Sequence, residues 1–360
     1  MHHYVYTVPT KPVSDTILDH APAAARAEIE LFASEAGLPK YRVNQIHRRI
    51  WQQPVGSWDE ATELPLDLRK ILADKLPLPR LGKETVQVSA DGTRKYLWRL
   101  EDGEAIESVL IPTGSRRTLC ISSQAGCALG CVFCATGRMG FRRNLSVWEI
   151  AGQVREIILE DPGLKPTNIV FMGMGEPLLN WPAVSTTLTI LNAPDGFGIG
   201  ARHITVSTVG IVPAMHEMAK RPEQFRLAIS LHAARTDRRL AIMPIEKKYD
   251  LAAVLASAKA FARRITFEYV LIAGQNDSDE DADALVALAR KHGALVNLLP
   301  LHPGGAPGLT PTAPARIRAF SERLREAGVE AVVRRSRGLD IAAACGQLRV
   351  EVEGRKRARP

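Results

Sequence analysis

The chain of 360 residues contains no uninterrupted apolar stretch long enough for a membrane-spanning helix, which needs ~18 residues. Its first residues, MHHYVYTVPTKP, lack the apolar centre of a secretory signal. No internal repeat is apparent, and a content of 46% hydrophobic and 24% charged residues excludes a disordered, collagen-like or coiled-coil chain. These absences predict a globular cytoplasmic protein that has no membrane partner.

Cysteine is also scarce, and its placement is informative. The chain has five cysteines, which are Cys120, Cys127, Cys131, Cys134 and Cys345. An odd and clustered set in a cytoplasmic chain is not a disulfide framework. Metal binding, redox chemistry and nucleophilic catalysis therefore remain as roles for these residues.

Positive charge exceeds negative charge, with 47 Lys and Arg against 39 Asp and Glu, a formal net charge of +8. The excess falls in short clusters, among them Arg116-Arg117, Arg142-Arg143, Arg238-Arg239, Arg263-Arg264 and the tail Arg355-Lys356-Arg357. Such clusters favour a polyanionic partner, most simply RNA or DNA, but they also occur on solvated helix faces.

The hydrophobic pattern predicts an α/β protein with four regions. Residues 1–83 show helical periodicity and form a small accessory domain, and residues 84–116 alternate as in a β-hairpin linker. Residues 117–350 form the core, in which six short β-branched strands alternate with helices that start near Val147, Trp181, Val212, Leu251 and Glu280. This order implies a parallel sheet, open or curled into a partial barrel, and residues 351–360 are a basic tail.

Polar or Gly-rich segments follow four of these strands. They are Cys127 to Cys134, Gly173-Met174-Gly175-Glu176-Pro177, Ser207-Thr208-Val209-Gly210 and Ser230-Leu231-His232. Because the carboxyl ends of parallel strands share one edge, these segments are expected to converge on one site.

The loop Cys127-x3-Cys131-x2-Cys134 brings three thiolates together, one fewer than a structural zinc site or an electron-transfer iron-sulfur cluster requires. Three ligands leave one iron of a [4Fe-4S] cluster open to a small molecule. The loop, with Phe133 before its last cysteine, resembles that of the radical S-adenosylmethionine (SAM) superfamily. The Gly173–Pro177 segment is similar to the superfamily segment that meets the amino group of SAM.

Longer segments resemble the bacterial ribosomal RNA adenine methyltransferases that use radical SAM chemistry. They include GMGEPLLN, AISLHA, MPIEKKYDL and RSRGLDIAAACGQL. The resemblance implies a partial (β/α)6 barrel, one cluster with three cysteine ligands and two SAM molecules per turnover. It implies that Cys345 is methylated, that a 5′-deoxyadenosyl radical activates this methyl group for addition to adenine, and that Cys120 frees the product through a disulfide.

The same resemblance assigns the remaining site residues. Glu107 matches the base that removes the ring proton, with Glu104 as the alternative. SAM contacts are carried over to Gly175, Glu176, Ser207, Ser230, Leu231, His232 and His302. His302 departs from the family, which usually has asparagine there, so it retains fewer hydrogen-bonding options than the amide.

The implied substrate is adenine C2 of 23S ribosomal RNA, with transfer RNA left open as a second substrate, and Arg142 and Arg143 are candidates for contact with the RNA. The implied partners are an electron donor such as flavodoxin or ferredoxin, and the chain is expected to be a monomer. Two alternatives remain: an adenine C8 methyltransferase, and a non-catalytic RNA-binding protein with a cysteine-bound metal.

Overall fold

The computed structural model describes residues 16–302, 306–334 and 337–341 of the chain. The α-helices of these residues are α1 (Pro22–Glu35), α2 (Tyr41–Arg48), α3 (Leu66–Lys75), α4 (Ala135–Met139), α5 (Val147–Glu160), α6 (Trp181–Asn192), α7 (Val212–Ala219), α8 (Thr236–Ile242), α9 (Leu251–Ala258), α10 (Asp279–His292) and α11 (Pro314–Glu326). The strands are β1 (Gly82–Val88), β2 (Arg94–Arg99), β3 (Ala105–Thr113), β4 (Arg116–Cys120), β5 (Gln124–Gly126), β6 (Phe141–Asn144), β7 (Asn168–Phe171), β8 (Ile204–Thr208), β9 (Arg226–Ser230), β10 (Thr266–Leu271), β11 (Leu295–Pro300) and β12 (Ala331–Val333).

The chain divides into two compact units. One unit comprises the described residues up to Leu81 together with Arg142–Lys165 and Pro182–Gly198. The other comprises Gly82–Phe141, Pro166–Trp181 and the described residues from Ile199 onward. None of the described helices is both long and apolar enough to cross a membrane.

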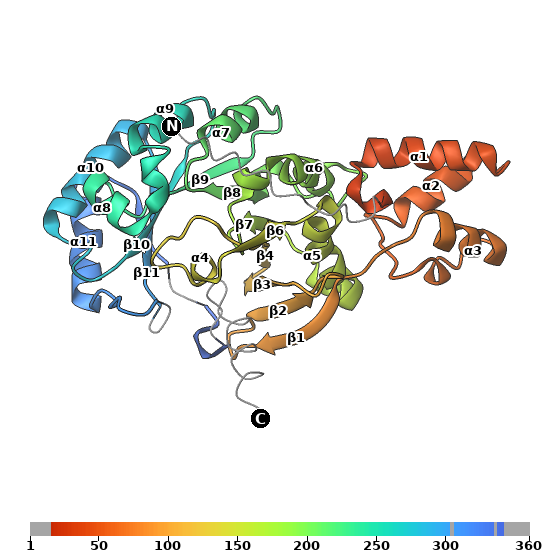
Figure 1. The fold of residues 1–360 in the computed structure, drawn as a ribbon, viewed down its shortest axis with the longest axis horizontal. Coiled ribbons are helices and arrows are strands. Elements are labelled where there is room, and N and C mark those ends of the chain that lie inside the picture. Colours follow the sequence, from red (N-terminus) through yellow and green to blue (C-terminus); the bar gives the residue numbers. More distant parts are fainter. Residues whose placement is uncertain (1–15, 303–305, 335–336, 342–360) are drawn as a thin grey trace. The chain divides into compact units, whose positions relative to one another are not determined.

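The second unit is built on one sheet with the order β1-β2-β3-β4-β7-β8-β9-β10-β11-β12. Strands β1 to β4 pair in antiparallel fashion, whereas β4 and all later members pair in parallel. The six predicted parallel strands are confirmed as β4 and β7 to β11, and Figure 1 shows helices α7 to α11 outside the later strands. Sequence reasoning missed β12, because three residues are too few to show a period.

The segment expected as a β-hairpin linker contains three strands. Strands β1, β2 and β3 form a three-stranded meander that joins the parallel sheet through β4. Tyr96 and Trp98 stack with their ring centroids 5.1 Å apart, and the Trp98 indole N–H donates to the Ser108 hydroxyl at 3.0 Å. The meander therefore has a packed face of its own and continues the main sheet.

Helix ends follow recognisable capping chemistry. In α10, the Ser278 hydroxyl accepts from the Asp281 N–H, the Asp281 carboxylate accepts from the Ser278 N–H, and Gly293 ends the helix at a φ of 58°. Such a capping box and left-handed glycine satisfy backbone groups that a helix leaves unpaired at its ends. The predicted starts of α5, α6, α7, α9 and α10 are confirmed to within one residue.

The first unit is held by polar contacts between distant segments. The Arg80 guanidinium binds the buried Glu156 carboxylate through Nε at 2.7 Å and Nη2 at 2.6 Å. The Trp58 indole donates to the Leu76 carbonyl at 2.7 Å, and the rings of Trp51 and Phe197 meet edge to face with their centroids 5.3 Å apart. Residues 142–165 and 182–198 thus share a core with the amino-terminal helices.

Candidate active site

A cavity of about 560 Å3 lies at the carboxyl ends of the parallel strands in the second unit. Its lining includes residues from β3, β4 and the cysteine loop, and from the ends of β7 to β11: Val109, Ile111, Cys120, Cys127, Cys131, Phe133, Cys134, Gly173, Gly175, Glu176, Ser207, Ser230, His232, Glu268, Leu299 and His302. The four segments that the sequence placed after successive strands are therefore brought together. This volume is typical of a small-molecule site.

Backbone hydrogen bonds hold the cysteine loop at both of its ends. The Cys127 N–H donates to the Gly140 carbonyl at 3.0 Å, and the Cys134 N–H donates to the Cys131 carbonyl at 3.1 Å. Cys134 then begins α4 at its N-cap position. These backbone bonds contribute to the shape of the loop, and all three of its cysteines line the cavity.

Burial raises the pKa of Cys127 to about 12 and, more strongly, that of Cys131, because a thiolate is poorly solvated there. Negative charge on neighbouring thiolates and on Glu176 adds to both shifts. Bound iron cations would offset this repulsion, so the donor set suits a positively charged centre that accepts thiolates. No three His, Cys, Asp or Glu side chains in the described ranges surround one ion-sized point. A [4Fe-4S] cubane has a different requirement, since each cysteine binds a different iron.

Glycines let the Gly173–Pro177 segment approach the segment after β4. A Cβ on Gly173 would lie 2.6 Å from the Ile121 carbonyl oxygen, and a Cβ on Gly175, where φ is 95°, would lie 2.4 Å from the Gln124 Cβ. The Gln124 side-chain carbonyl accepts from the Glu176 N–H at 2.8 Å. Only glycine fits this packing and backbone conformation at position 175.

The Glu176 carboxylate connects two strand ends instead of pointing freely into the cavity. It accepts from the Leu178 N–H and from the Val209 N–H, each at 3.0 Å. Burial raises the pKa of Glu176 to about 7, although these backbone donors favour the ionised form. Glu176 therefore fixes the loop after β7 relative to the loop after β8.

The serines and histidine of the SAM-like segments lie in the cavity wall. The hydroxyls of Ser207 and Ser230 are 3.2 Å apart. His232 has a left-handed φ of 55°, and its Nδ1 accepts from the Val270 N–H at 3.1 Å. That bond leaves the proton on Nε2, while burial and the charge of Arg239 lower the pKa of His232 to about 3. His232 is thus a neutral ring that contacts Phe133, with ring centroids 4.6 Å apart.

The other predicted site residues take distinct positions. Cys120, the last residue of β4, lines the cavity as a buried free thiol. Glu107 is buried in β3, on the same face as the cavity-lining Val109 and Ile111, whereas Glu104 is half-buried in the preceding turn.

Two further residues were predicted to contact SAM. His302 lines the cavity, but the Leu231 side chain does not. Cys345 lies outside the described residues.

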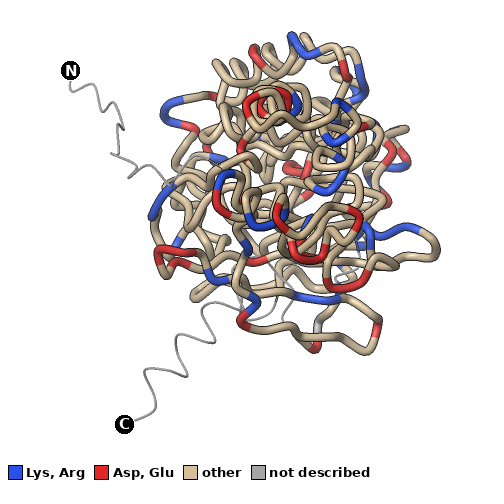
Figure 2. Tube along the Cα trace, turned by 90° about the vertical axis from the view of Figure 1, so that its right-hand side faces the viewer, with Lys and Arg blue, Asp and Glu red and all other residues tan. Residues whose placement is uncertain are grey.

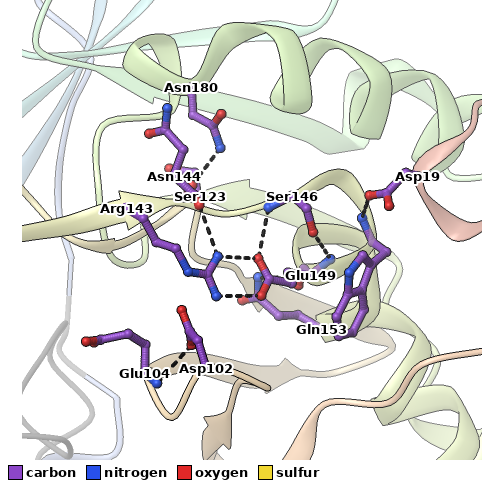
Figure 3. A network of polar contacts seen from close by, with 11 residues as sticks. Asp19, Asp102, Glu104, Ser123, Arg143, Asn144, Ser146, Glu149, Gln153 and Asn180 are labelled. Carbon is purple, nitrogen blue, oxygen red and sulfur yellow. Dashed lines mark hydrogen bonds and ion pairs between the residues drawn. The ribbon is translucent and has the colours of Figure 1, made fainter. Parts of the chain in front are cut away.

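A polar network in the first unit involves one of the proposed RNA-binding arginines (Figure 3). The Arg143 guanidinium forms two 2.7 Å bonds with the buried Glu149 carboxylate, which also accepts from the Ser146 N–H at 2.9 Å. Arg143 therefore supports the start of α5, whereas the Arg142 side chain is exposed.

Sequence reasoning missed a buried group behind the cavity. Arg239 is fully buried, pairs with Glu246, and donates to the carbonyls of Val209 at 2.7 Å and Leu231 at 3.2 Å. It thereby holds the ends of β8 and β9. The motif MPIEKKYDL contains Glu246, but a buried arginine in a basic dipeptide resembles any surface arginine in sequence.

The fold and the cysteine loop at the strand ends define a radical SAM enzyme, and residues 121–286 match the model of the Radical SAM superfamily. The chain is 57% identical over 94% of both chains to a Gemmatimonas aurantiaca protein named "Probable dual-specificity RNA methyltransferase RlmN". It is 44% identical to the dual-specificity RNA methyltransferase RlmN of Anaeromyxobacter dehalogenans, over 94% of both chains. A crystal structure of a radical SAM methyltransferase from Sphaerobacter thermophilus has a TM-score of 0.85 and 41% identity, covering 92% of this chain and 98% of that one. The chain belongs to the RlmN family of radical SAM methyltransferases.

Proposed function

We propose that the protein methylates C2 of an adenine in 23S ribosomal RNA, with transfer RNA as a second substrate. The observation that carries this proposal is that Cys120, the three cysteines of the loop and the Gly175-Glu176 segment line one and the same cavity. The dual-specificity names of the relatives support an RNA substrate of two kinds. The segments GEPLLN and RSRG favour the C2 position over C8.

The residues present fit one [4Fe-4S] cluster held by Cys127, Cys131 and Cys134. When bound, the cluster supplies the single electron that splits SAM. Gly175 and Glu176 position the methionine end of SAM through their backbone, and Ser207, Ser230 and His232 offer hydroxyl and N–H groups to its polar atoms. His302 supplies one hydrogen bond at a place where the family usually has an amide, and Leu231 contributes its backbone.

We assign the transfer itself to three residues of the chain. Cys345 carries the methyl group as a thioether and is the point at which the RNA becomes covalently attached. Glu107 removes the proton from the methylated ring carbon, because its carboxyl shares a sheet face with the cavity wall. Cys120, as a thiolate, then attacks the sulfur of Cys345, so that an S–S bond forms as the bond between this sulfur and the transferred carbon breaks. The freed carbon takes up a proton to become the methyl group, and the electron donor takes back one electron. A two-electron thiol reductant would then restore both cysteines for the next turnover.

The test is methylation of ribosomal RNA fragments by protein reconstituted anaerobically with iron and sulfide. Digested wild-type product should contain 2-methyladenosine by mass spectrometry. Cys345→Ala should give no methylated RNA, whereas Cys120→Ala should accumulate protein covalently bound to RNA. 8-Methyladenosine without 2-methyladenosine would contradict the C2 assignment, and full activity of Cys345→Ala would remove that residue from the mechanism.

Glu104→Gln is the matched control for Glu107→Gln, since both carboxylates lie in one short segment. Glu107→Gln should lower the rate by about 10²–10⁴-fold, as expected for loss of a general base. Glu104→Gln should retain nearly full activity. The reverse pattern would transfer the role of base to Glu104.

A further inference from the structure

A second cavity of about 540 Å3 lies at the opposite ends of three strands of the same unit. Its lining is Gln224, Arg226, Ala262, Arg263, Arg264, Ile265, Thr266 and Leu295. Arg226 begins β9, and Ser230, which ends β9, lines the candidate active site. The two cavities are therefore separated by the length of the strand, roughly 13 Å at ~3.3 Å per residue.

The lining of this second cavity carries positive charge without a carboxylate. Arg264 is compensated, because it pairs with Glu330 and its Nε donates to the Gly293 carbonyl at 2.8 Å. Arg226 is exposed and has no carboxylate partner in the described part of the chain. Arg263 donates only to the neutral Gln224 side chain, at 3.1 Å. Two guanidinium groups at one cavity therefore have no compensating carboxylate among the described residues.

A hydrogen bond to the Gln224 side chain holds the Arg263 guanidinium in place. Gln224, which accepts its Nη2–H, has a left-handed φ of 57°, a conformation that residues other than glycine seldom adopt. The buried Arg263 Nε has no hydrogen-bond partner in the described ranges. A buried donor without a partner costs free energy that a bound acceptor would recover.

We propose that this cavity binds a phosphate group through Arg226 and Arg263. Planar guanidinium groups match the geometry of phosphate oxygens, and two of them at one cavity favour a dianion or a phosphodiester over a neutral ligand. Lys and Arg are interspersed with Asp and Glu along most of the chain (Figure 2), so a cavity lined only by basic and neutral residues is distinctive. The phosphate belongs either to the backbone of the RNA, which rests on the proposed function, or to a small free phosphate.

The experiment compares wild type, the double variant Arg226→Gln/Arg263→Gln and the control Arg318→Gln. Arg318 is an exposed arginine of α11 outside both cavities, and it has no carboxylate partner among the described residues. One arm measures affinity for ribosomal RNA fragments and for transfer RNA at several salt concentrations without reductant. The other arm titrates inorganic phosphate by calorimetry at low salt. Circular dichroism checks that each variant is folded.

For an RNA phosphate, the slope of log affinity against log salt should become less steep in the double variant, by about 0.7–0.9 for each phosphate that is no longer neutralised. The slope should not change in Arg318→Gln. For a free phosphate, wild type and the double variant should show the same slope of log RNA affinity against log salt. Inorganic phosphate should then bind wild type and not the double variant. If neither arm separates the folded double variant from wild type, the proposal is overturned. Failure of wild type to bind or methylate RNA would overturn the proposed function alone, since the phosphate arm still decides this inference.

Discussion

The guanidinium of Arg239 lies against the carboxylate of Glu246, and both side chains are buried directly behind the candidate active site. The same guanidinium binds the carbonyls of Val209 and Leu231, and the same carboxylate accepts from the Leu251 N–H at 2.9 Å. The pair therefore ties the ends of β8 and β9 to the start of α9. A buried charge of this kind is stable only while its partner is present.

Removing both members of this pair should lower the free energy of unfolding by less than the sum of the two single removals. We expect Arg239→Met or Glu246→Leu to lower the free energy of unfolding by about 3–5 kcal/mol, because each leaves a buried charge unpaired. The double variant Arg239→Met/Glu246→Leu should lose less than the sum of the single losses. Urea denaturation of the four proteins measures this coupling, and strictly additive losses would show that the two charges do not interact.

Gly175 should be intolerant of a side chain for two separable reasons. Gly175→Ala places a Cβ 2.4 Å from Gln124 at a φ of 95°, so both the backbone conformation and the packing oppose it. Gly114 also has a positive φ, 57°, but a Cβ there meets nothing within 4 Å. Gly114→Ala should cost about 1–2 kcal/mol from conformation alone. Gly175→Ala should cost more and should weaken SAM binding, measured by calorimetry; equal effects of the two changes would contradict the packing argument.

His232 should make the protein sensitive to acid. Its pKa falls from 6.5 to about 3 on folding, so the unfolded chain binds more protons between these values. The free energy of unfolding should therefore decrease as pH falls from 6.5 toward 3, by up to about 1.4 kcal/mol per pH unit from this residue. His232→Asn keeps an acceptor for the Val270 N–H and tolerates the left-handed backbone, but does not titrate. Its unfolding should show a correspondingly smaller loss in acid, and an unchanged pH profile would refute the assignment.

The sequence predicted the parts of this site that depend on residues close together in the chain. It did not predict the contacts between residues that are far apart in the chain and meet only in the fold. The six strand runs, the cysteine spacing and the glycines of GMGEP are local, and each lies where the pattern placed it. The roles of Arg239 and of the Glu176 carboxylate depend on strands that meet only in the folded sheet. Arg143 was a candidate for contact with RNA because it lies in a basic pair. In the structure its guanidinium binds the Glu149 carboxylate near the start of α5.

Glu176 should give the opposite pH dependence to that of His232. Burial raises its pKa from 4.5 to about 7, so the folded protein binds more protons than the unfolded chain between these values. The contribution of Glu176 to the free energy of unfolding should therefore fall as pH rises from 4.5 to 7, by up to about 1.4 kcal/mol per pH unit. Glu176→Gln removes this titration, and its amide can accept only one of the two bonds from Leu178 and Val209, which should cost about 1–3 kcal/mol. Urea denaturation of the metal-free proteins at pH 5 and pH 7 measures both effects; a constant difference between wild type and variant across this range would show that Glu176 stays ionised throughout.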